Sequence, residues 1–462
     1  MFAAPKATSF NVPHEGQVEA ALELLNQSTS GPAKASKKLE LAALHALQGE
    51  GGLEHGTLYL IGAAETDRYI CVTPLYQALC WEFAAYCGEQ PKQIRKGLRA
   101  VLSSGHPVAL FHAARALVAA GMNRRALRIL ENLTDEQLPP HLVWRRWSLL
   151  GLASANCRDF DAAVRSYFVS ARLTQGTDGQ REQLSLAEGW LALGQLDEAF
   201  MVLEGFFERE SQGLSDDIKL RQRYLWALLQ TRLGNVQLAL NALLEAYTLA
   251  ENGGYTVFEI LLELGRTYLG LGDVKRANSS YEKARLAATA KQLSFITHEH
   301  AVMLSETGRY GEAHHLLKKV ITDKHYSGRP LAMSDLAHVL FIQGNVAQAS
   351  AVAQHALKVE ANAPACITLA EIALQSYDYA AARRWLEQAL GLAKEGDSDW
   401  LSAQVLSAEV LAQQDYANPG RLIHHAEQAL AHLPPDHEWV AALQAYLSTA
   451  KMRLGERKRL LN

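Results

Sequence analysis

The sequence contains few residues that break helices or favour strands. Proline occurs only 13 times in 462 residues, and most prolines fall at the junctions between predicted helices. β-Branched residues are scarce while Ala and Leu dominate, so helix is the default expectation. No apolar run reaches the roughly 18 residues of a membrane span, and residues 1–16 lack the apolar core of a signal peptide. We therefore expect a helical, cytoplasmic protein without membrane insertion.

An excess of one charge and a cysteine framework are also missing. The net charge is −4 with a pI near 6.5, so no global basic field marks a nucleic-acid-binding protein. The cysteine count is five, an odd number, and no C-x-x-C occurs. Three of them, Cys71, Cys80 and Cys87, lack convergent ligand spacing, so we interpret them as buried thiols in a reducing compartment.

Motifs for catalysis, cofactors and metals are absent from the sequence. It contains no G-x-S-x-G, no H-E-x-x-H, no P-loop and no dinucleotide-binding glycine pattern. The adjacent pairs His314–His315 and His424–His425 invite a metal hypothesis. Neighbouring residues on a helix point about 100° apart, so neither pair can chelate one ion well. We predict no enzyme activity, no cofactor and no metal site.

What the chain does contain is a repeat, which sets in at about Pro107. A small residue is followed twelve positions later by alanine, eight times in succession, with 33 to 40 residues between units. These pairs are Ala114/Ala126, Gly151/Ala163, Ala187/Ala199, Ala227/Ala239, Gly265/Ala277, Ala301/Ala313, Ala337/Ala349 and Ala370/Ala382. In six units a glycine stands seven positions after the first small residue. Small residues let two helices cross closely, so each unit predicts a helical hairpin that needs similar neighbours.

The pattern resembles the tetratricopeptide repeat, whose signature is W-x2-L-G-x2-Y followed by A-x3-F-x2-A. The opening matches at Trp147–Gly151 and the middle at Leu264–Tyr268. The second half matches at Ala277, Tyr281 and Ala284, and again at Ala382, Leu386 and Ala389. A ninth, degenerate unit spans 401–434. The resemblance implies an all-α, right-handed α-solenoid of helical hairpins that binds proteins and has no catalytic role.

The two ends of the chain depart from the repeat. We expect residues 1–35 to hold a tail, a helix at 17–27 and a linker at 28–35, and residues 36–106 to form an irregular helical region. Residues 107–433 would form the eight to nine repeats, and residues 434–462 a C-terminal capping helix. Within the irregular region, Thr57–Gly62 and Arg68–Thr73 are the only β-leaning runs. They predict either a short β-hairpin or a helix pair with an odd turn.

In arrays of this family the first helix of each unit lines the concave groove. The residue six before the small one is then expected to point inward, and it is arginine in three successive units. With neighbouring inward positions, the candidate partner-binding residues are Arg145, Arg181, Arg221, Tyr224, Arg266, Phe295, His298 and His338. Arginine suits carboxylates and stacks on aromatic groups, so the groove could clamp an acidic or C-terminal peptide. The alternative is that these arginines are solvated or pair with groove carboxylates such as Glu188 and Glu259.

Three functional hypotheses follow. The first is a non-enzymatic scaffold or adaptor that binds a protein or peptide in the groove. The second is a signal-responsive regulator, in which a repeat sensor is attached to a degenerate N-terminal DNA-binding or effector module. Residues 36–73 would then form a degenerate winged-helix module. The third is a self-assembling scaffold, because arrays without full caps can stack or dimerise as homo-oligomers. The Lys and Asn set of the family's chaperone-tail clamp is missing, so a cochaperone role is not supported.

Overall fold

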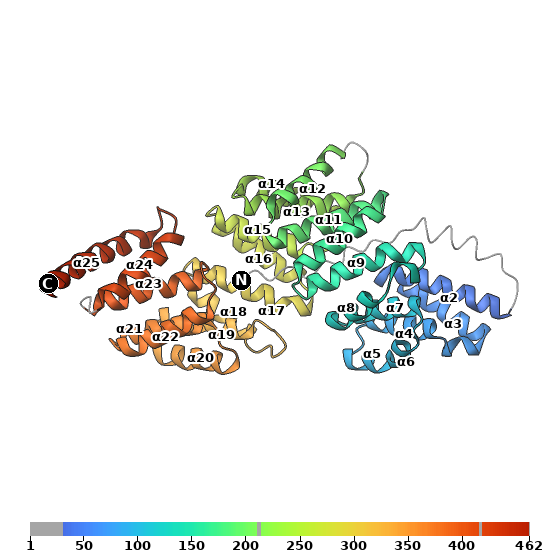
Figure 1. Ribbon diagram of the computed structural model, residues 1–462, viewed down its shortest axis with the longest axis horizontal. Coiled ribbons are helices and arrows are strands. Elements are labelled where there is room, and N and C mark those ends of the chain that lie inside the picture. Colours follow the sequence, from blue (N-terminus) through green and yellow to red (C-terminus); the bar gives the residue numbers. More distant parts are fainter. Residues whose placement is uncertain (1–30, 210–213, 415–417, 462) are drawn as a thin grey trace. The chain divides into compact units, whose positions relative to one another are not determined.

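The computed structural model describes residues 31–209, 214–414 and 418–461, and every regular element in these residues is a helix (Figure 1). The chain divides into two compact units, Met1–Tyr255 and Thr256–Asn462. The fold is therefore all-α, and its helices pack as successive hairpins. No helix in the described part of the chain is long and apolar enough to cross a membrane.

The first unit begins with an irregular group of helices and continues with regular hairpins. Its α-helices are α2 (Gly31–Leu47), α3 (Leu53–Thr66), α4 (Pro74–Tyr86), α5 (Pro91–Gly97), α6 (Arg99–Ser103), α7 (Pro107–Ala119), α8 (Asn123–Asn132), α9 (Pro140–Asn156), α10 (Phe160–Leu173), α11 (Gly176–Leu193), α12 (Leu196–Arg209), α13 (Asp216–Arg232) and α14 (Val236–Gly253). Three short 3-10 helices, η1 (Gly49–Gly52), η2 (Arg68–Val72) and η3 (Asp135–Gln137), lie between them.

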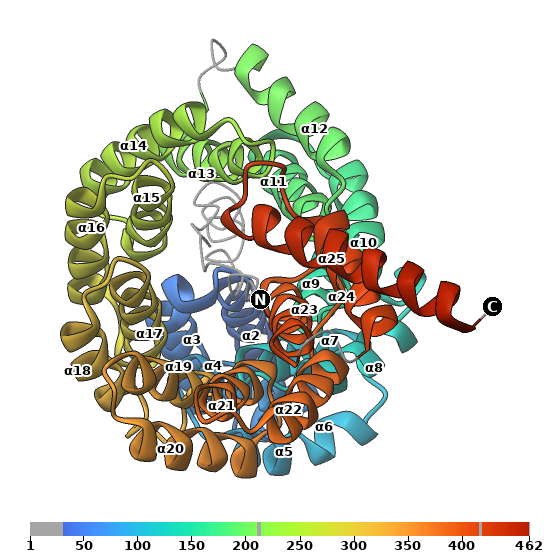
Figure 2. The same ribbon diagram turned by 90° about the vertical axis from the view of Figure 1, so that its left-hand side faces the viewer.

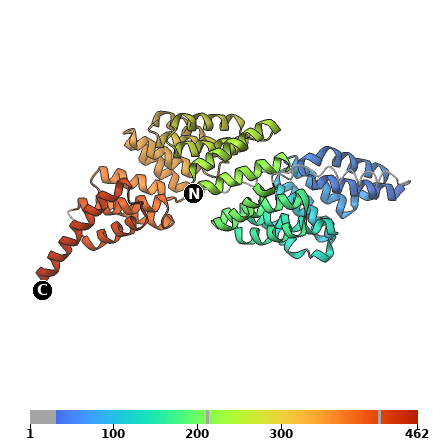
Figure 3. The ribbon, with the colours of Figure 1, turned by 90° about the horizontal axis from the view of Figure 1, so that it is seen from above.

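The second unit continues the hairpins to the C-terminus. Its helices are α15 (Phe258–Gly270), α16 (Val274–Ala287), α17 (Ala290–Glu306), α18 (Tyr310–Val320), α19 (Arg329–Ile342), α20 (Val346–Val359), α21 (Ala363–Gln375), α22 (Tyr379–Leu392), α23 (Ser398–Gln413), α24 (Pro419–His432) and α25 (Glu438–Leu461). Within this unit the first helices α15, α17 and α19 form an inner row, and the second helices α16, α18 and α20 an outer row (Figure 2). The last helix, α25, follows the hairpin α23/α24 and covers it with Leu443 and Ala450 (Figure 3).

The small residues of the repeat lie where the two helices of each hairpin cross. All eight pairs are buried. At Gly265 an added Cβ would lie 2.8 Å from the ring of Tyr281, and at Gly151 it would lie 2.7 Å from the ring of Tyr167. Glycine is thus required at both positions because a tyrosine of the second helix packs directly on the backbone of the first.

The turns of the hairpins need a left-handed residue. The six predicted turn glycines, for example Gly272, have φ between +75° and +80°. The only described non-glycine residues with positive φ are Arg158 (φ +64°) and Tyr377 (φ +57°). Both stand seven residues after the small residue of their units, Gly151 and Ala370, so they occupy the turn-glycine position. A side chain in this conformation is strained by the contact of its Cβ with the carbonyl oxygen.

We predict that Arg158→Gly and Tyr377→Gly each stabilise the protein. The gain should be about 0.5–1 kcal/mol, because relief of left-handed strain exceeds the entropy that glycine adds to the unfolded chain. The matched control is Gly272→Ala, which meets no neighbouring atom within 4 Å but has φ +75°, and should lose about 1 kcal/mol. Thermal unfolding midpoints measure all three, and a fall for both glycine variants would contradict the prediction.

Residues 57–73, for which the sequence predicts either a β-hairpin or a helix pair, are helical. Residues 57–62 lie inside α3, and residues 68–72 form η2, so the hairpin is wrong and the helix pair is confirmed. Leu60 and Ala63 of α3 are buried against α2 and α4, and this packing outweighs the β-leaning composition of the segment. The linker prediction is also wrong for residues 31–35, which belong to α2. The helix predicted at 17–27 lies outside the described residues.

The segment from Pro91 to Ser103, within the irregular region, forms two short helices. Helix α5 ends at Gly97 and α6 begins at Arg99. The break lies against Trp81 of α4. A Cβ at Gly97 would lie 1.8 Å from the indole of Trp81, so the backbone of Gly97 packs directly on that side chain.

A buried charge cluster, which no sequence pattern predicts, joins three helices of the first unit. Glu82 of α4 is fully buried, with Oε2 2.6 Å from Nδ1 of His112 and Oε1 2.6 Å from Nε of Arg115. Arg115 of α7 also donates to the Ala46 carbonyl of α2 and to the Tyr86 hydroxyl. The cluster ties the irregular helices to the first regular hairpin.

Candidate functional site

The predicted partner-binding residues lie on the first helices of both units, and we call the surface that they line the first-helix face. Arg145 of α9 is half-buried and forms no ion pair with any described residue. Its Nη1 donates to the His141 carbonyl of its own helix, at 2.6 Å, and its guanidinium lies 4.2 Å from the ring centre of Trp144. Burial lowers the pKa of Arg145 to about 10, against the opposing effect of Asp178.

The arginines that stand at the same position in the next two repeats form ion pairs within the chain. Arg181 of α11 lies with Nη2 2.9 Å from Oδ2 of Asp217 on α13. Arg221 of α13 lies with Nη2 2.8 Å from Oε2 of Glu188 on α11. These ion pairs join consecutive first helices, as expected under the alternative that the arginines bind groove carboxylates. Tyr224 on the same face is buried, with 8% of its surface exposed, so most of its ring serves packing.

A second line of polar residues on these helices was missed. Arg146, Glu182 and Gln222 each stand five residues before the small residue of their unit, and all three are buried. The second unit has apolar residues at this position, for example Ile260 and Ile296. Glu182 accepts a hydrogen bond from Ser148 at 2.8 Å, while its other oxygen has no partner, and burial raises the pKa of its carboxyl. The signal was present in the sequence as charged residues at a repeat position that is elsewhere apolar.

The predicted residues of the second unit are also engaged. Arg266 of α15 forms ion pairs with Glu263 at 2.6 Å and with Glu299 of α17. His298 lies with Nε2 2.6 Å from Asp335 and Nδ1 3.0 Å from the Tyr326 hydroxyl. Phe295 is partly buried against the core of α17 and α19. His338 is half-buried, and burial lowers its pKa although Asp335 opposes this effect.

Carboxylates without a cationic partner mark the first-helix face of the second unit. Burial raises the pKa of Glu371 to about 7, and the nearby Glu409 adds to this effect. One oxygen of Glu371 is buried without a hydrogen-bond partner. Burial also raises the pKa of Glu306, with Glu299 and Asp335 adding to the shift. The face in this unit is therefore acidic, so an anchor for an acidic partner has to be sought in the first unit.

The histidine pairs that invited a metal hypothesis take part in local contacts. His314 lies 3.1 Å from the Gln343 amide oxygen, and His425 lies 2.6 Å from that of Gln404. In the described part of the chain, no three His, Cys, Asp or Glu side chains converge as metal ligands. The five cysteines are free thiols. The prediction of buried thiols is wrong for Cys87, which is exposed, and Cys71 and Cys80 are only half-buried. Cys157 is half-buried and Cys366 is buried.

Comparison with known proteins matches residues 258–284 to the family model of the tetratricopeptide repeat, and this match covers α15 and most of α16. No curated protein sequence matches the chain. Among solved structures, it is similar to a tetratricopeptide repeat protein from Parabacteroides merdae, with 17% identity and a TM-score of 0.43 over 58% of this chain and 98% of that one. It is also similar to a chain of the APC/C hetero-tetramer Cut9–Hcn1, with 13% identity and a TM-score of 0.39 over 95% and 99%. A third is the apo form of the quorum sensor NprR from B. thuringiensis, with 16% identity and a TM-score of 0.44 over 67% and 79%.

Proposed function

We propose that this chain, which is a tetratricopeptide-repeat protein, is a non-enzymatic scaffold that binds a segment of a partner protein on its first-helix face. Proteins of this family generally act as scaffolds for protein interactions. The finer proposal is that Arg145 anchors a carboxylate of the partner, supplied by an acidic side chain or by a free C-terminus.

The observation that carries the proposal is the difference between Arg145 and its two successors. Arg181 and Arg221 have carboxylates of this chain at 2.9 and 2.8 Å, whereas half-buried Arg145 has only a backbone carbonyl and an aromatic ring. Asp178 and Glu182 act on the charge of Arg145 only from beyond ion-pair distance. A partly desolvated guanidinium without a carboxylate in contact is unfavourable, and a partner carboxylate would supply this contact through the guanidinium fork. The surrounding Trp144 would shield this contact from water, as at other interface anchors.

The experiment is affinity capture with the partner quantified by mass spectrometry. Arg145→Glu should lower partner recovery about tenfold, equivalent to about 1.4 kcal/mol for one lost charged anchor. The matched control is Arg128→Glu, an exposed position on the second helix α8, which should leave recovery unchanged. The triple change of Arg145, Arg181 and Arg221 to Glu should abolish capture of the partner. Unchanged recovery with the triple variant would refute binding on the first-helix face.

The regulator hypothesis loses the structural feature on which it depended. Its winged-helix version required a hairpin in residues 57–73, and these residues form α3 and η2. We therefore retain the scaffold as the proposal. Self-assembly stays a separate prediction, for which light scattering coupled to size exclusion measures the molar mass directly.

A further inference from the structure

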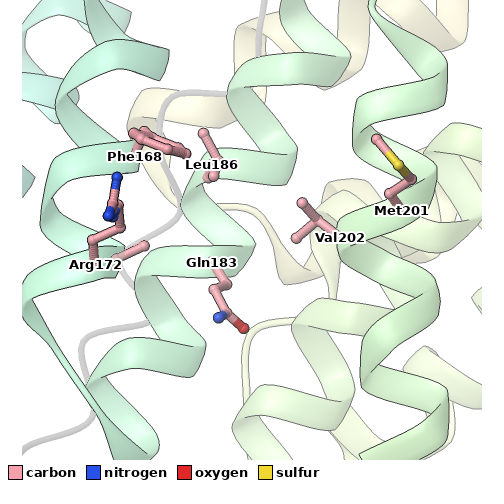
Figure 4. A pocket seen from close by; sticks show the side chains of 7 residues that line it. Phe168, Arg172, Gln183, Leu186, Met201 and Val202 are labelled. Carbon is pink, nitrogen blue, oxygen red and sulfur yellow. The ribbon is translucent and has the colours of Figure 1, made fainter.

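A second surface of the first unit lies away from the first-helix face. It is a groove between α10 and α12 with α11 as its floor, and it encloses a cavity of about 240 Å³ (Figure 4). It is lined by Ala171 and by the larger side chains of Phe168, Arg172, Gln183, Leu186, Met201 and Val202. On α11, Gln183 and Leu186 stand two and five residues after Arg181, so they point to sides of the helix about 160° and 140° away from it. The groove is thus on the second-helix side, and its function does not depend on the function of the first-helix face.

The groove has exposed apolar side chains, whereas two aromatic residues of α12 pack on α13. The rings of Phe200 and Phe207 lie 5.4 and 4.8 Å from that of Trp226 on α13. Met201, on the same helix, has 67% of its surface exposed, and Phe168 on α10 across the groove has 48%. Two large apolar side chains that face one cavity with this exposure indicate an interaction surface.

The two edges of the groove carry opposite charge. On α10, Arg165 and Arg172 flank Phe168 by about one helical turn on each side. On α12, the residues within about one turn of Met201 are Asp197, Glu198 and Glu204. None of these five side chains forms an ion pair with a described residue, and the guanidinium of Arg172 lies 5.6 Å from the centre of the Phe168 ring. The edges therefore present unneutralised charges to a partner.

We propose that this outer groove binds an amphipathic helix of a partner protein. The helix would place a strip of large apolar residues on Phe168, Leu186, Met201 and Val202. One flank of the strip would be acidic and face Arg165 and Arg172, and the other would be basic and face the carboxylates of α12. Helices that dock in grooves are recognised by apolar anchors at spacings of three and four residues, and charge complementarity selects among them.

The test uses four fluorescently labelled helical peptides with the full-length protein. All have Leu and Phe at positions i, i+3, i+4 and i+7 except one, in which Ser replaces them. The flanks are Glu on one side and Lys on the other, Glu on both, or Lys on both; the Ser peptide has mixed flanks. The mixed-flank apolar peptide should bind about tenfold more tightly than either same-charge peptide, and the Ser peptide should not bind. Equal binding of the three apolar peptides, or no binding of any, would overturn the proposal.

Two protein variants sharpen the test. Arg165→Glu with Arg172→Glu makes both edges acidic, so the preference should shift to the Lys-flanked peptide, and an unchanged preference would contradict the assigned edges. Met201→Asp alters an exposed residue and should abolish binding of the mixed-flank peptide while circular dichroism stays unchanged; retained binding would refute the groove as the site. Light scattering on the wild-type protein addresses self-docking. A dimer that Met201→Asp dissociates would show that the groove binds a second copy and would overturn the proposal.

Discussion

Replacing Glu82 with alanine is expected to destabilise the first unit by about 3–5 kcal/mol, the usual cost of breaking a buried ion pair. The substitution leaves the buried His112 and the partly buried Arg115 without their carboxylate. Arg115 would then keep only the Ala46 carbonyl and the Tyr86 hydroxyl as partners. The effect should be local, so amide hydrogen exchange should quicken in α2, α4 and α7 and not in the second unit.

The control for this change is Glu131→Ala, which removes an exposed carboxylate on α8. It should alter stability by less than about 0.5 kcal/mol.

Burial alone would raise the pKa of Glu82, but Arg115 and His112 outweigh it and hold the pKa below its usual range. A lowered pKa means that the stabilisation is complete at pH 7 and is lost as the pH falls through the folded-state value. The stability difference between wild type and Glu82→Gln should therefore shrink on acidification below about pH 4.5. A difference that stays constant into acid would contradict the ion-pair account.

Tyr281→Ala is expected to have a similarly large effect, about 3–5 kcal/mol, because it removes a ring that is 2% exposed. This ring fills the space left by Gly265 on α15 and stacks on His300 of α17, with 5.5 Å between ring centres and 3° between planes. The substitution should weaken the packing within the hairpin α15/α16 and the contact of this hairpin with α17 of the next repeat. Chemical denaturation followed by circular dichroism measures it.

Coupling between Gly265 and Tyr281 tests the close crossing itself. Gly265→Leu alone should cost about 1–3 kcal/mol, since its side chain would collide with the tyrosine ring. In the double variant the leucine would occupy part of the cavity left by Tyr281→Ala. The destabilisation of the double variant should therefore be smaller than the sum of the two single destabilisations. Strict additivity would show that the glycine and the tyrosine do not share one packing site.

The repeat could be predicted from the sequence because its demands are local and recur. A twelve-residue offset of small residues and a glycine seven positions on describe one hairpin geometry, and the observed φ angles extend it to Arg158 and Tyr377. The N-terminal region could not be predicted as well. Its helices are fixed by contacts distant in sequence, such as Arg115 with Ala46 and Gly97 with Trp81, and these leave no periodic pattern.

The candidate site was predicted in position but not in its internal pairing. Repeat register shows which residues share a face, but the ion pairs of Arg181 and Arg221 depend on side-chain reach between neighbouring units. The sequence suggests Glu188, the partner of Arg221, as a groove carboxylate, but it does not suggest Asp217, the partner of Arg181. The outer groove could not be predicted, because the exposure of Met201 and Phe168 depends on how α10, α11 and α12 pack together and leaves no periodic pattern in the sequence.

The most direct test of the scaffold proposal is site-specific photo-cross-linking with the captured partner. A photoreactive residue at position 152, one residue after Gly151 on the first-helix face, should cross-link to the partner. The same residue at exposed position 131 on α8 should not. Adding Arg145→Glu should remove the cross-link from position 152. A partner that cross-links equally from both positions, or that still cross-links from position 152 after Arg145→Glu, would contradict binding at Arg145.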